Sequence, residues 1–178
     1  MIEHFYNTLE GENWFDYENV YRDAVNSAKD GAVFVEVGSW KGKSAAFMAV
    51  EIINSGKKIQ FYSIDDWSLG GTKEEFYKNI EPVKEYIGVI DSISWEAARI
   101  FADNSIDFCF LDGAHDYDGV KKDISAFMPK VKIGGIMAGH DYTPAMDADN
   151  QVYFAVNEMI GAKNISLINN VWLYERNI

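Results

Sequence analysis

Cysteine is almost absent from this chain, and its scarcity excludes whole classes of protein. The 178 residues include a single cysteine, Cys109. One cysteine cannot form an internal disulfide bond, so disulfides do not hold this fold together. Cys109 lies in the apolar run 108–111, where we expect a buried apolar side chain and no redox chemistry.

Long apolar runs and an excess of basic residues are missing too. No apolar run reaches the roughly 18 to 20 residues of a membrane helix, and residues 1–10 lack the pattern of a signal peptide. The 28 acidic residues outnumber the 16 basic ones, which gives a formal net charge of −12. Such a charge repels phosphate backbones. We therefore expect a soluble, cytoplasmic protein that acts on a small molecule and binds neither nucleic acid nor membranes.

Strand and helix patterns alternate along the chain, which predicts an α/β fold. The length and the 48% apolar content suit one domain over 1–178, with an N-terminal helical segment at 1–30 and a core sheet at 31–178. We predict strands at 33–37, 59–64, 86–90, 107–111, 136–138, 165–168 and 171–174. Helices are predicted at 17–28, 43–54, 72–80, 94–101, 116–127 and 149–160, with Asp16, Ser94 and Asp116 as N-caps. The whole is a doubly wound (Rossmann-like), mostly parallel seven-stranded sheet with helices on both faces and a C-terminal antiparallel hairpin.

The segment 32–46 is the most informative stretch of the chain. An apolar strand ends at Glu36-Val37, turns through Gly38 and Gly42, and restarts as a helix at Lys43. Glycine allows a tight turn close to a ligand, and the free N–H groups of the first helical turn can bind it. This arrangement predicts a cofactor cradle that includes Ser39 and Ser44.

The spacing of the glycines separates the cofactor classes. The dinucleotide pattern Gly-x-Gly-x-x-Gly fails, because Glu36 and Lys41 occupy two of its glycine positions. A phosphate-binding loop would need one residue more between Gly38 and the Gly42-Lys43-Ser44 triplet. The remaining pattern, Glu-x-Gly-x-x-x-Gly, resembles motif I of the class I methyltransferases that use S-adenosylmethionine (SAM). That resemblance implies that Glu36 faces the ammonium of the cofactor, whereas the alternative is a glycine turn of another α/β domain.

Acidic residues follow most of the predicted strands. Glu36, Asp65, Asp112 and the pair His140-Asp141 each end a strand, at the edge of the sheet where ligands bind in doubly wound folds. We predict that Asp65 accepts the ribose hydroxyls of the cofactor. Trp67 and Ser94 are candidates to contact the adenine, although Trp67 can equally be a packing residue and Ser94 a helix cap.

Two further segments make the resemblance specific. Leu-Asp-Gly-Ala-His-Asp-Tyr at 111–117 and Gly-His-Asp-Tyr at 139–142 look like the small-molecule O-methyltransferase branch of the class I family, which includes antibiotic-tailoring sugar methyltransferases. The resemblance covers about 14–174. It implies a Mg²⁺ site at Asp112 and at positions 140 and 141, with His115 as the proposed base. This chain has His140 where those relatives have glutamate.

The His140 difference leaves two versions of the chemistry open. In one, Asp112, His140 and Asp141 hold Mg²⁺ or another divalent metal, and His115 takes the proton of the acceptor hydroxyl. In the other, His115 or His140 acts as the base without a metal. Rival interpretations are a SAM-binding accessory protein without catalysis and an NAD-linked oxidoreductase. The acceptor pocket is expected from 1–15, 68–77 and 142–150, including a mobile cover at 68–71, and we predict a homodimer.

Overall fold

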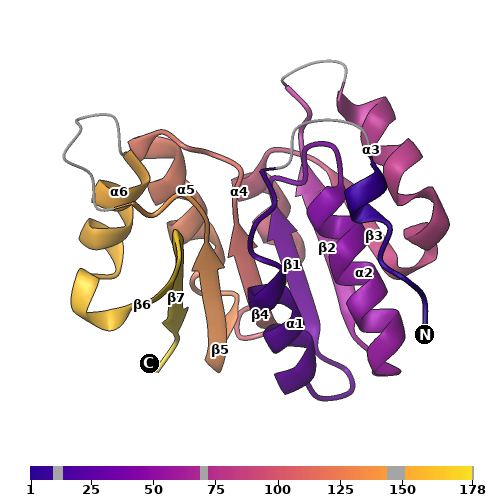
Figure 1. Ribbon diagram of the computed structural model, residues 1–178. Helices are drawn as coiled ribbons and strands as arrows, with labels where there is room; N and C mark the ends of the chain where they lie inside the picture. The colour runs from indigo at the N-terminus through magenta and orange to yellow at the C-terminus, as the bar shows by residue number, and fades with distance from the viewer. Residues whose placement is uncertain (10–13, 69–71, 144–150, 178) are drawn as a thin grey trace.

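The structure is a computed structural model that describes residues 1–9, 14–68, 72–143 and 151–177. Its strands form one sheet in the order β3-β2-β1-β4-β5-β7-β6 (Figure 1). The strands are β1 (Val33–Val37), β2 (Gln60–Asp65), β3 (Ile87–Asp91), β4 (Ile106–Leu111), β5 (Val131–Gly139), β6 (Ser166–Ile168) and β7 (Val171–Glu175). The first five run parallel, and β7 is antiparallel to both β5 and β6. This topology confirms the predicted fold class.

Helices cover both faces of the sheet. They are α1 (Glu18–Ser27), α2 (Lys43–Ser55), α3 (Thr72–Ile80), α4 (Ser94–Ala97), α5 (Tyr117–Phe127) and α6 (Gln151–Met159). Short 3₁₀ turns lie at Tyr6–Thr8, Glu81–Tyr86, Ala98–Ile100 and Ala162–Asn164. None of the helices within the described segments is both long and apolar enough to span a membrane.

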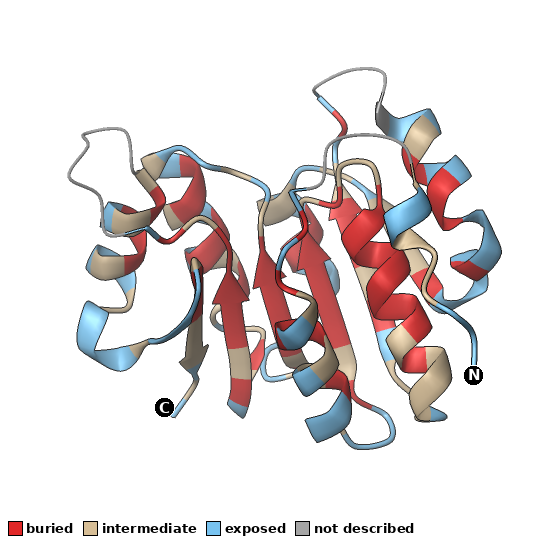
Figure 2. Ribbon diagram, viewed as in Figure 1, coloured by how far each residue is buried: buried red, intermediate tan, exposed pale blue. Residues whose placement is uncertain are grey.

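Two apolar clusters lie on opposite faces of the sheet because side chains alternate along each strand. Phe34 packs with residues of α1, α2 and α3, whereas its neighbour Val35 packs with residues of α4, α5 and α6. The strands are therefore buried on both sides at the centre of the molecule (Figure 2). Cys109 is fully buried in the second cluster, as expected, and burial raises the pKa of its thiol.

Three local predictions were wrong. Strand β5 begins at Val131, five residues earlier than predicted. It runs through Gly134-Gly135, where its register against β4 is irregular, whereas the prediction began the strand after these glycines. Ser94 does not cap α4, which is only one turn long and continues as a 3₁₀ turn. Asp16 does not cap α1, whose N-cap is Tyr17 without a side-chain hydrogen bond. Asp116 does cap α5, where it accepts a hydrogen bond from the Gly119 N–H.

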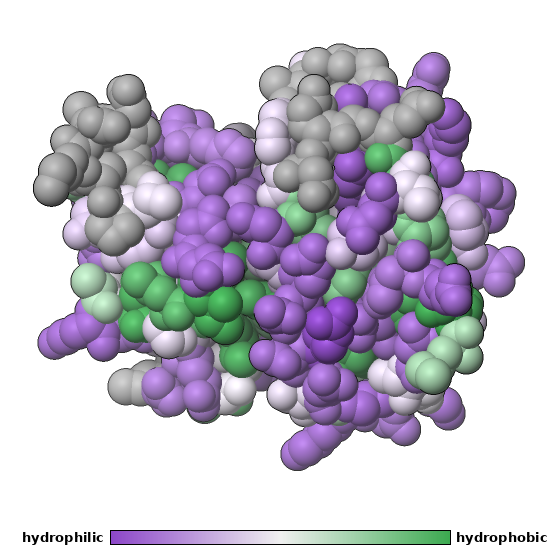
Figure 3. All heavy atoms as spheres, viewed as in Figure 1, coloured by the Kyte–Doolittle hydropathy of each residue, from purple (hydrophilic) through white to green (hydrophobic). Residues whose placement is uncertain are grey.

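The surface seen in Figure 3 is mostly hydrophilic, in keeping with the acidic composition. A hydrophobic area lies on this face over β5 and β7, beside α1. Ile136 and Leu173, on those two strands, are partly buried against the α1 side of the core. The predicted homodimer stays a prediction.

Candidate active site

A large cavity opens at the carboxyl ends of β1, β2, β4 and β5. Its volume is about 1000 Å³, which is room for a nucleoside cofactor together with a small second ligand. It lies at the point where the strand order reverses between β1 and β4, the usual ligand site of doubly wound sheets. The lining residues that the sequence identified are Gly38, Ser39, Gly42, Ser44, Asp65, Trp67, Ser94, Asp112, His115, His140 and Asp141.

The glycine turn after β1 has the tight backbone conformation that its sequence predicts. Contacts within the protein, in addition to the space needed for a ligand, account for its glycines. Gly38 and Gly42 have φ values of +85° and +80°. A Cβ on Gly38 would lie 2.0 Å from the carbonyl oxygen of Asp112, and one on Gly42 would lie 2.9 Å from the ring of Phe76. Neighbouring parts of the protein, and not only a ligand, therefore require these glycines.

Asp65 at the end of β2 supports the same turn. Its Oδ2 accepts hydrogen bonds from the N–H groups of Ser39 and Trp40, at 2.8 and 2.7 Å. Its Oδ1 accepts a third from the N–H of Trp67, at 2.8 Å. Asp65 therefore shapes the loop, and its predicted contact with the ribose stays a prediction. Asp66, which no sequence pattern singled out, is exposed on the cavity wall beside it.

The cavity wall contains unusual backbone conformations. Five non-glycine residues of the described segments have positive φ, and three of them, Trp40, Trp67 and Asp141, line the cavity. Residues in such conformations concentrate at functional sites, where the surrounding structure holds them. Trp67 is 6% exposed and donates its indole N–H to the carbonyl of Trp40. Trp67 therefore shapes the wall as well as lining it.

Glu36 lies beneath the cavity floor. It is 1% exposed and is not among the lining residues, and its carboxylate accepts hydrogen bonds from the hydroxyls of Tyr21 (2.9 Å) and Ser39 (3.1 Å). Burial raises the pKa of Glu36 to about 7, against the opposing effect of hydrogen bonds from Ser44, Tyr21 and Ser39. The predicted contact with a cofactor ammonium stays a prediction.

The raised pKa of Glu36 predicts a pH-dependent stability. Because the folded protein holds this proton more tightly than the unfolded chain, the contribution of Glu36 to stability is complete below about pH 4.5 and is lost as the pH rises to about 7. The shift corresponds to about 3 kcal/mol at most. We expect the unfolding free energy, measured by urea titration from pH 5 to pH 8, to fall less in Glu36→Gln than in the parent, because the raised pKa values of Asp123 and His140 keep their own pH dependence in both proteins. Parallel pH profiles of the variant and the parent would contradict the assignment.

Ser94 connects the adenine side of the cavity to α5. Its hydroxyl donates to the carboxylate of Asp123, which is 2% exposed. Burial raises the pKa of Asp123 to about 6, although hydrogen bonds from Ser94 and from the backbone of Ala114 lower it. Ser94 lines the cavity, so its predicted adenine contact stays open.

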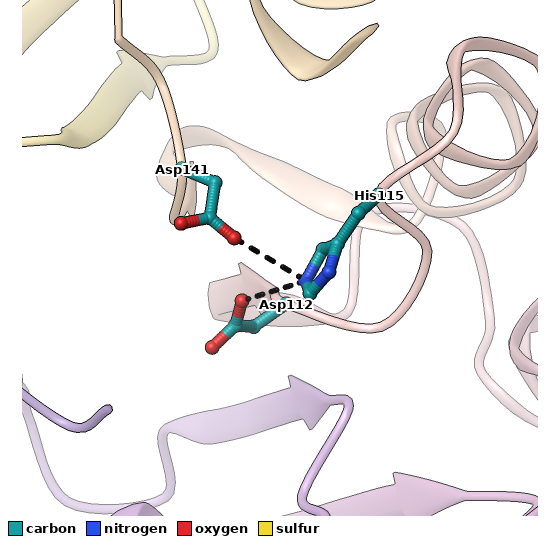
Figure 4. Close-up of side chains that lie close together, drawn as sticks. All are labelled: Asp112, His115 and Asp141. Atoms are coloured by element: carbon teal, nitrogen blue, oxygen red, sulfur yellow. Dashed lines mark hydrogen bonds and ion pairs between the residues drawn. The ribbon is translucent and has the colours of Figure 1, made fainter. Parts of the chain in front are cut away.

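The acceptor side of the cavity brings together Asp112, His115 and Asp141. Nε2 of His115 lies 3.4 Å from Oδ1 of Asp112 and 3.4 Å from Oδ2 of Asp141 (Figure 4). Asp112 directly follows β4, His115 lies on the loop before α5, and Asp141 lies two residues after β5. The hydrogen bond that the ring donates to the Asp112 carboxylate raises the pKa of His115, against the effect of burial. Burial raises the pKa of Asp112, but its contacts with His115 and His140 leave that pKa below its ordinary value.

Within the described residues, the same three side chains form the group whose ligand atoms lie within 4.8 Å of one another. The group contains Asp112 and Asp141 of the predicted metal set, with His115 in place of His140. Two carboxylates and an imidazole are a donor set that Mn²⁺, Fe²⁺ or Zn²⁺ accepts more readily than Mg²⁺ does.

His140 has different partners. Its side chain is 9% exposed, and its Nε2 contacts Oδ1 of Asp16 at 3.0 Å and the amide nitrogen of Asn170 at 2.9 Å. Its Nδ1 lies 3.3 Å from Asp141 and 3.6 Å from Asp112. Burial lowers the pKa of His140, but the Asp112, Asp141 and Asp16 carboxylates together raise it to about 9.

The N-terminal segment contributes residues to the cavity wall: Trp14 falls in the predicted acceptor segment 1–15, whereas Asp16 and Tyr17 lie beyond it. Trp14 stacks on Trp40 with ring centroids 4.4 Å apart, and both line the cavity. Asp16 and Tyr17 lie beside them and reach the acceptor side. Of the predicted acceptor segments, 10–13, 69–71 and 144–150 lie outside the described residues, and with them most of the predicted cover at 68–71.

Comparison with known proteins now decides the family. A family model described as a methyltransferase domain matches residues 35–142, more than half of the chain. The chain belongs to this methyltransferase family. An uncharacterized protein of Acanthamoeba polyphaga mimivirus, R132, is 27% identical over 149 residues, which are 74% of this chain and 61% of that protein. The chain thus spans about three fifths of the length of this relative.

Solved structures share the fold of this methyltransferase domain. The O-methyltransferase NovP superposes with a TM-score of 0.68 at 16% identity, over 90% of this chain and 79% of NovP. The TDP-rhamnose 3′-O-methyltransferase CalS11 gives 0.61 at 16% identity, over 89% and 76% of the two chains. A precorrin-6y C5,15-methyltransferase of Geobacter metallireducens gives 0.67 at 11% identity, over 94% and 93%. Since these neighbours are named for methyl transfer to oxygen and to carbon, the fold does not fix the acceptor atom.

Proposed function

We propose that this methyltransferase domain moves the methyl group of SAM to an oxygen atom of a small acceptor molecule. The observation that carries the proposal is the position of His115, between two carboxylates at the same cavity that contains the glycine turn of motif I. A candidate base and a cofactor cradle that share one cavity are the minimum a methyl transfer to a hydroxyl needs.

The cofactor occupies the β1–β2 side in this proposal. The turn from Gly38 to Ser44 surrounds the amino-acid part of SAM, and the acids at the end of β2 accept the ribose hydroxyls. Asp66 offers an exposed carboxylate for this contact, next to Asp65, whose two oxygens already accept three backbone hydrogen bonds. Trp67 and Ser94 line the cavity where the adenine would follow.

The chemistry takes place on the β4–β5 side. The acceptor hydroxyl gives its proton to Nε2 of His115 while its oxygen attacks the methyl carbon. A carbon–oxygen bond forms, the carbon–sulfur bond of the sulfonium breaks, and the electron pair of that bond stays on sulfur to give neutral S-adenosylhomocysteine. The carboxylates of Asp112 and Asp141 stabilise the imidazolium that forms, because each lies 3.4 Å from the proton-accepting nitrogen.

A metal-assisted version has its own support in the grouping of Asp112, His115 and Asp141. A divalent ion held there would lower the pKa of the acceptor hydroxyl. In that version Nε2 of His115 is a ligand, so it does not act as the base.

The charge of the chain favours a small acceptor over a nucleic acid. The net charge is −12, and the carboxylates of Asp16, Asp112 and Asp141 line the acceptor side of the cavity. Phosphate groups would be repelled there unless a metal were present. A neutral or cationic hydroxyl compound is the acceptor class that this electrostatic environment supports.

Calorimetric titration with S-adenosylhomocysteine tests the cofactor assignment. We expect saturable binding of this product and none of NAD, the ligand of the rival oxidoreductase hypothesis. Repeating the titration with Mg²⁺, with Mn²⁺ and with a chelator separates the two versions of the site, since only the metal-assisted one predicts metal uptake that Asp112→Asn removes. Binding of NAD without binding of S-adenosylhomocysteine would refute the proposal.

A further inference from the structure

We propose that Tyr17 and Asp16, at the start of α1, are positioning residues that orient the acidic and imidazole groups of the acceptor side. The inference rests on the proposed function for its catalytic meaning, but the contacts themselves are tested without turnover. No side chain caps the start of α1.

An acid lies one residue before the N-cap of α1, but its carboxylate contacts another part of the chain and does not cap the helix. Asp16 directly precedes the N-cap residue Tyr17, and no side chain caps the helix. The carboxylate of Asp16 instead lies 3.0 Å from Nε2 of His140, 124 residues further along the chain. A helix start that forgoes a common stabilising contact in this way suggests that the acid serves the site.

Tyr17 fixes one oxygen of Asp112. Its hydroxyl donates to Oδ2 of Asp112 at 3.0 Å, and its side chain is 4% exposed. The ring stacks on Phe110 of β4 with centroids 4.5 Å apart, so the packed ring holds the hydroxyl in place. With Oδ2 engaged, Oδ1 is the oxygen that lies 3.4 Å from His115 and 3.6 Å from His140.

Tyr21, one helical turn later, makes the equivalent contact on the cofactor side. Its hydroxyl donates to Glu36 at 2.9 Å, and its ring lies 5.2 Å from that of Tyr17. Residues four apart share one face of a helix. The register of α1 therefore sets two carboxylates at once, Glu36 beneath the cofactor cradle and Asp112 on the acceptor side.

Asp16 completes the arrangement by orienting His140. The contact between this carboxylate and Nε2 fixes the orientation of the ring and leaves Nδ1 directed at the other acids. Nδ1 lies 3.3 Å from Asp141 and 3.6 Å from Asp112. His140 thus links the two carboxylates that flank His115, and Asp16 holds that link from the opposite side.

Nuclear magnetic resonance of the histidine rings tests the proposal directly. The chain has three histidines, so ring nitrogens labelled with ¹⁵N give few signals to assign. In Tyr17→Phe we expect the ring signals of His115 and His140 to shift, and in Asp16→Asn those of His140. The signals of His4, which stacks on Phe47 and contacts Glu51 of α2 and does not line the cavity, should stay in place.

Tyr6→Phe is the matched control. It also removes a hydroxyl that donates to an acid of α1, Glu18, at 2.9 Å. We expect no change at His115 or His140 in this variant. Unchanged imidazole signals in both Tyr17→Phe and Asp16→Asn would overturn the proposal, and Asp16→Asn keeps the test open if Tyr17→Phe does not fold, because Asp16 is exposed.

A kinetic comparison tests the catalytic meaning. With an acceptor in hand, Tyr17→Phe should lower kcat roughly tenfold, the effect of losing one hydrogen bond to a charged group, with little change in KM for SAM. A rise in KM for SAM with unchanged kcat would contradict a positioning role. If the parent protein binds no S-adenosylhomocysteine, the proposed function fails, whereas the histidine signals still decide whether the contacts exist.

Discussion

The His115→Ala variant is expected to lose methyl transfer by roughly a hundredfold to ten thousandfold, the usual contribution of a positioned base. Its affinity for S-adenosylhomocysteine should stay within about threefold of the parent, because His115 lies on the acceptor side of the cavity. The measurement is transfer of radiolabelled methyl from SAM to a panel of small hydroxyl compounds, with calorimetric titration of the product on the same samples.

His4→Ala is the control for this result. His4 stacks on Phe47 with centroids 4.3 Å apart and its Nε2 lies 2.8 Å from Glu51, so it belongs to the packing of α2 and not to the cavity. We expect this variant to keep its transfer rate once its folding has been checked. Full activity of His115→Ala would remove His115 from the chemistry, in either the base or the metal version of the site.

Gly38→Ala is expected to lower the free energy of unfolding by roughly 3 kcal/mol or more, since it adds a backbone clash to a left-handed φ. The new Cβ would lie 2.0 Å from the carbonyl oxygen of Asp112. The loops after β1 and β4 would have to separate, and these loops form the cavity. Urea titration measures the stability loss, and titration with S-adenosylhomocysteine should show the accompanying loss of binding.

Gly31→Ala is a matched control because Gly31 has the same φ of +85° but no atom within 4 Å of the place where a Cβ would lie. We expect it to cost about 1 kcal/mol, the strain of the left-handed conformation alone. The difference between the two variants then measures the contact at Asp112. Equal losses would show that the loops adjust to a side chain at position 38.

The class of the sheet and the location of the cavity followed from the sequence for a simple reason. Periodic apolar segments and the glycines after β1 are local features, and the rule that ligands bind at the carboxyl ends of parallel strands converts them into a place in space. Asp65, Asp112 and Asp141 reach the cavity as predicted because each lies at or within two residues of the carboxyl end of a strand.

Hydrogen-bond partners far apart along the chain could not be predicted in this way. Asp16 fits the pattern of a helix cap, and nothing in the surrounding letters indicates that it reaches His140. Asp123 lies on the inner face of α5, and its pairing with Ser94 depends on how α4 and α5 pack. Sequence patterns place a polar residue on an element, but its partner depends on tertiary packing.

Two other features depend on contacts between distant parts of the chain. His4 lies near the chain terminus, where fraying is common, yet it stacks on Phe47 and contacts Glu51, because α2 offers both an aromatic ring and an acid. Strand β5 continues through Gly134, whose φ of +79° accommodates the register irregularity there, although the prediction began this strand only at 136. In both cases the local sequence is compatible with two structures, and contacts with distant elements select one of them.

The central claim, that the cavity supports methyl transfer from SAM to a small hydroxyl compound, is tested most directly by the label-transfer assay on the parent protein. Protein is incubated with methyl-labelled SAM and the acceptor panel, with Mn²⁺ in one series and a chelator in the other, and structured RNA as a further acceptor. We predict label on at least one small hydroxyl compound, none on RNA, and loss of that product in His115→Ala. Binding of S-adenosylhomocysteine with no labelled product across the panel would instead favour an accessory role, and label on RNA would contradict the acceptor class.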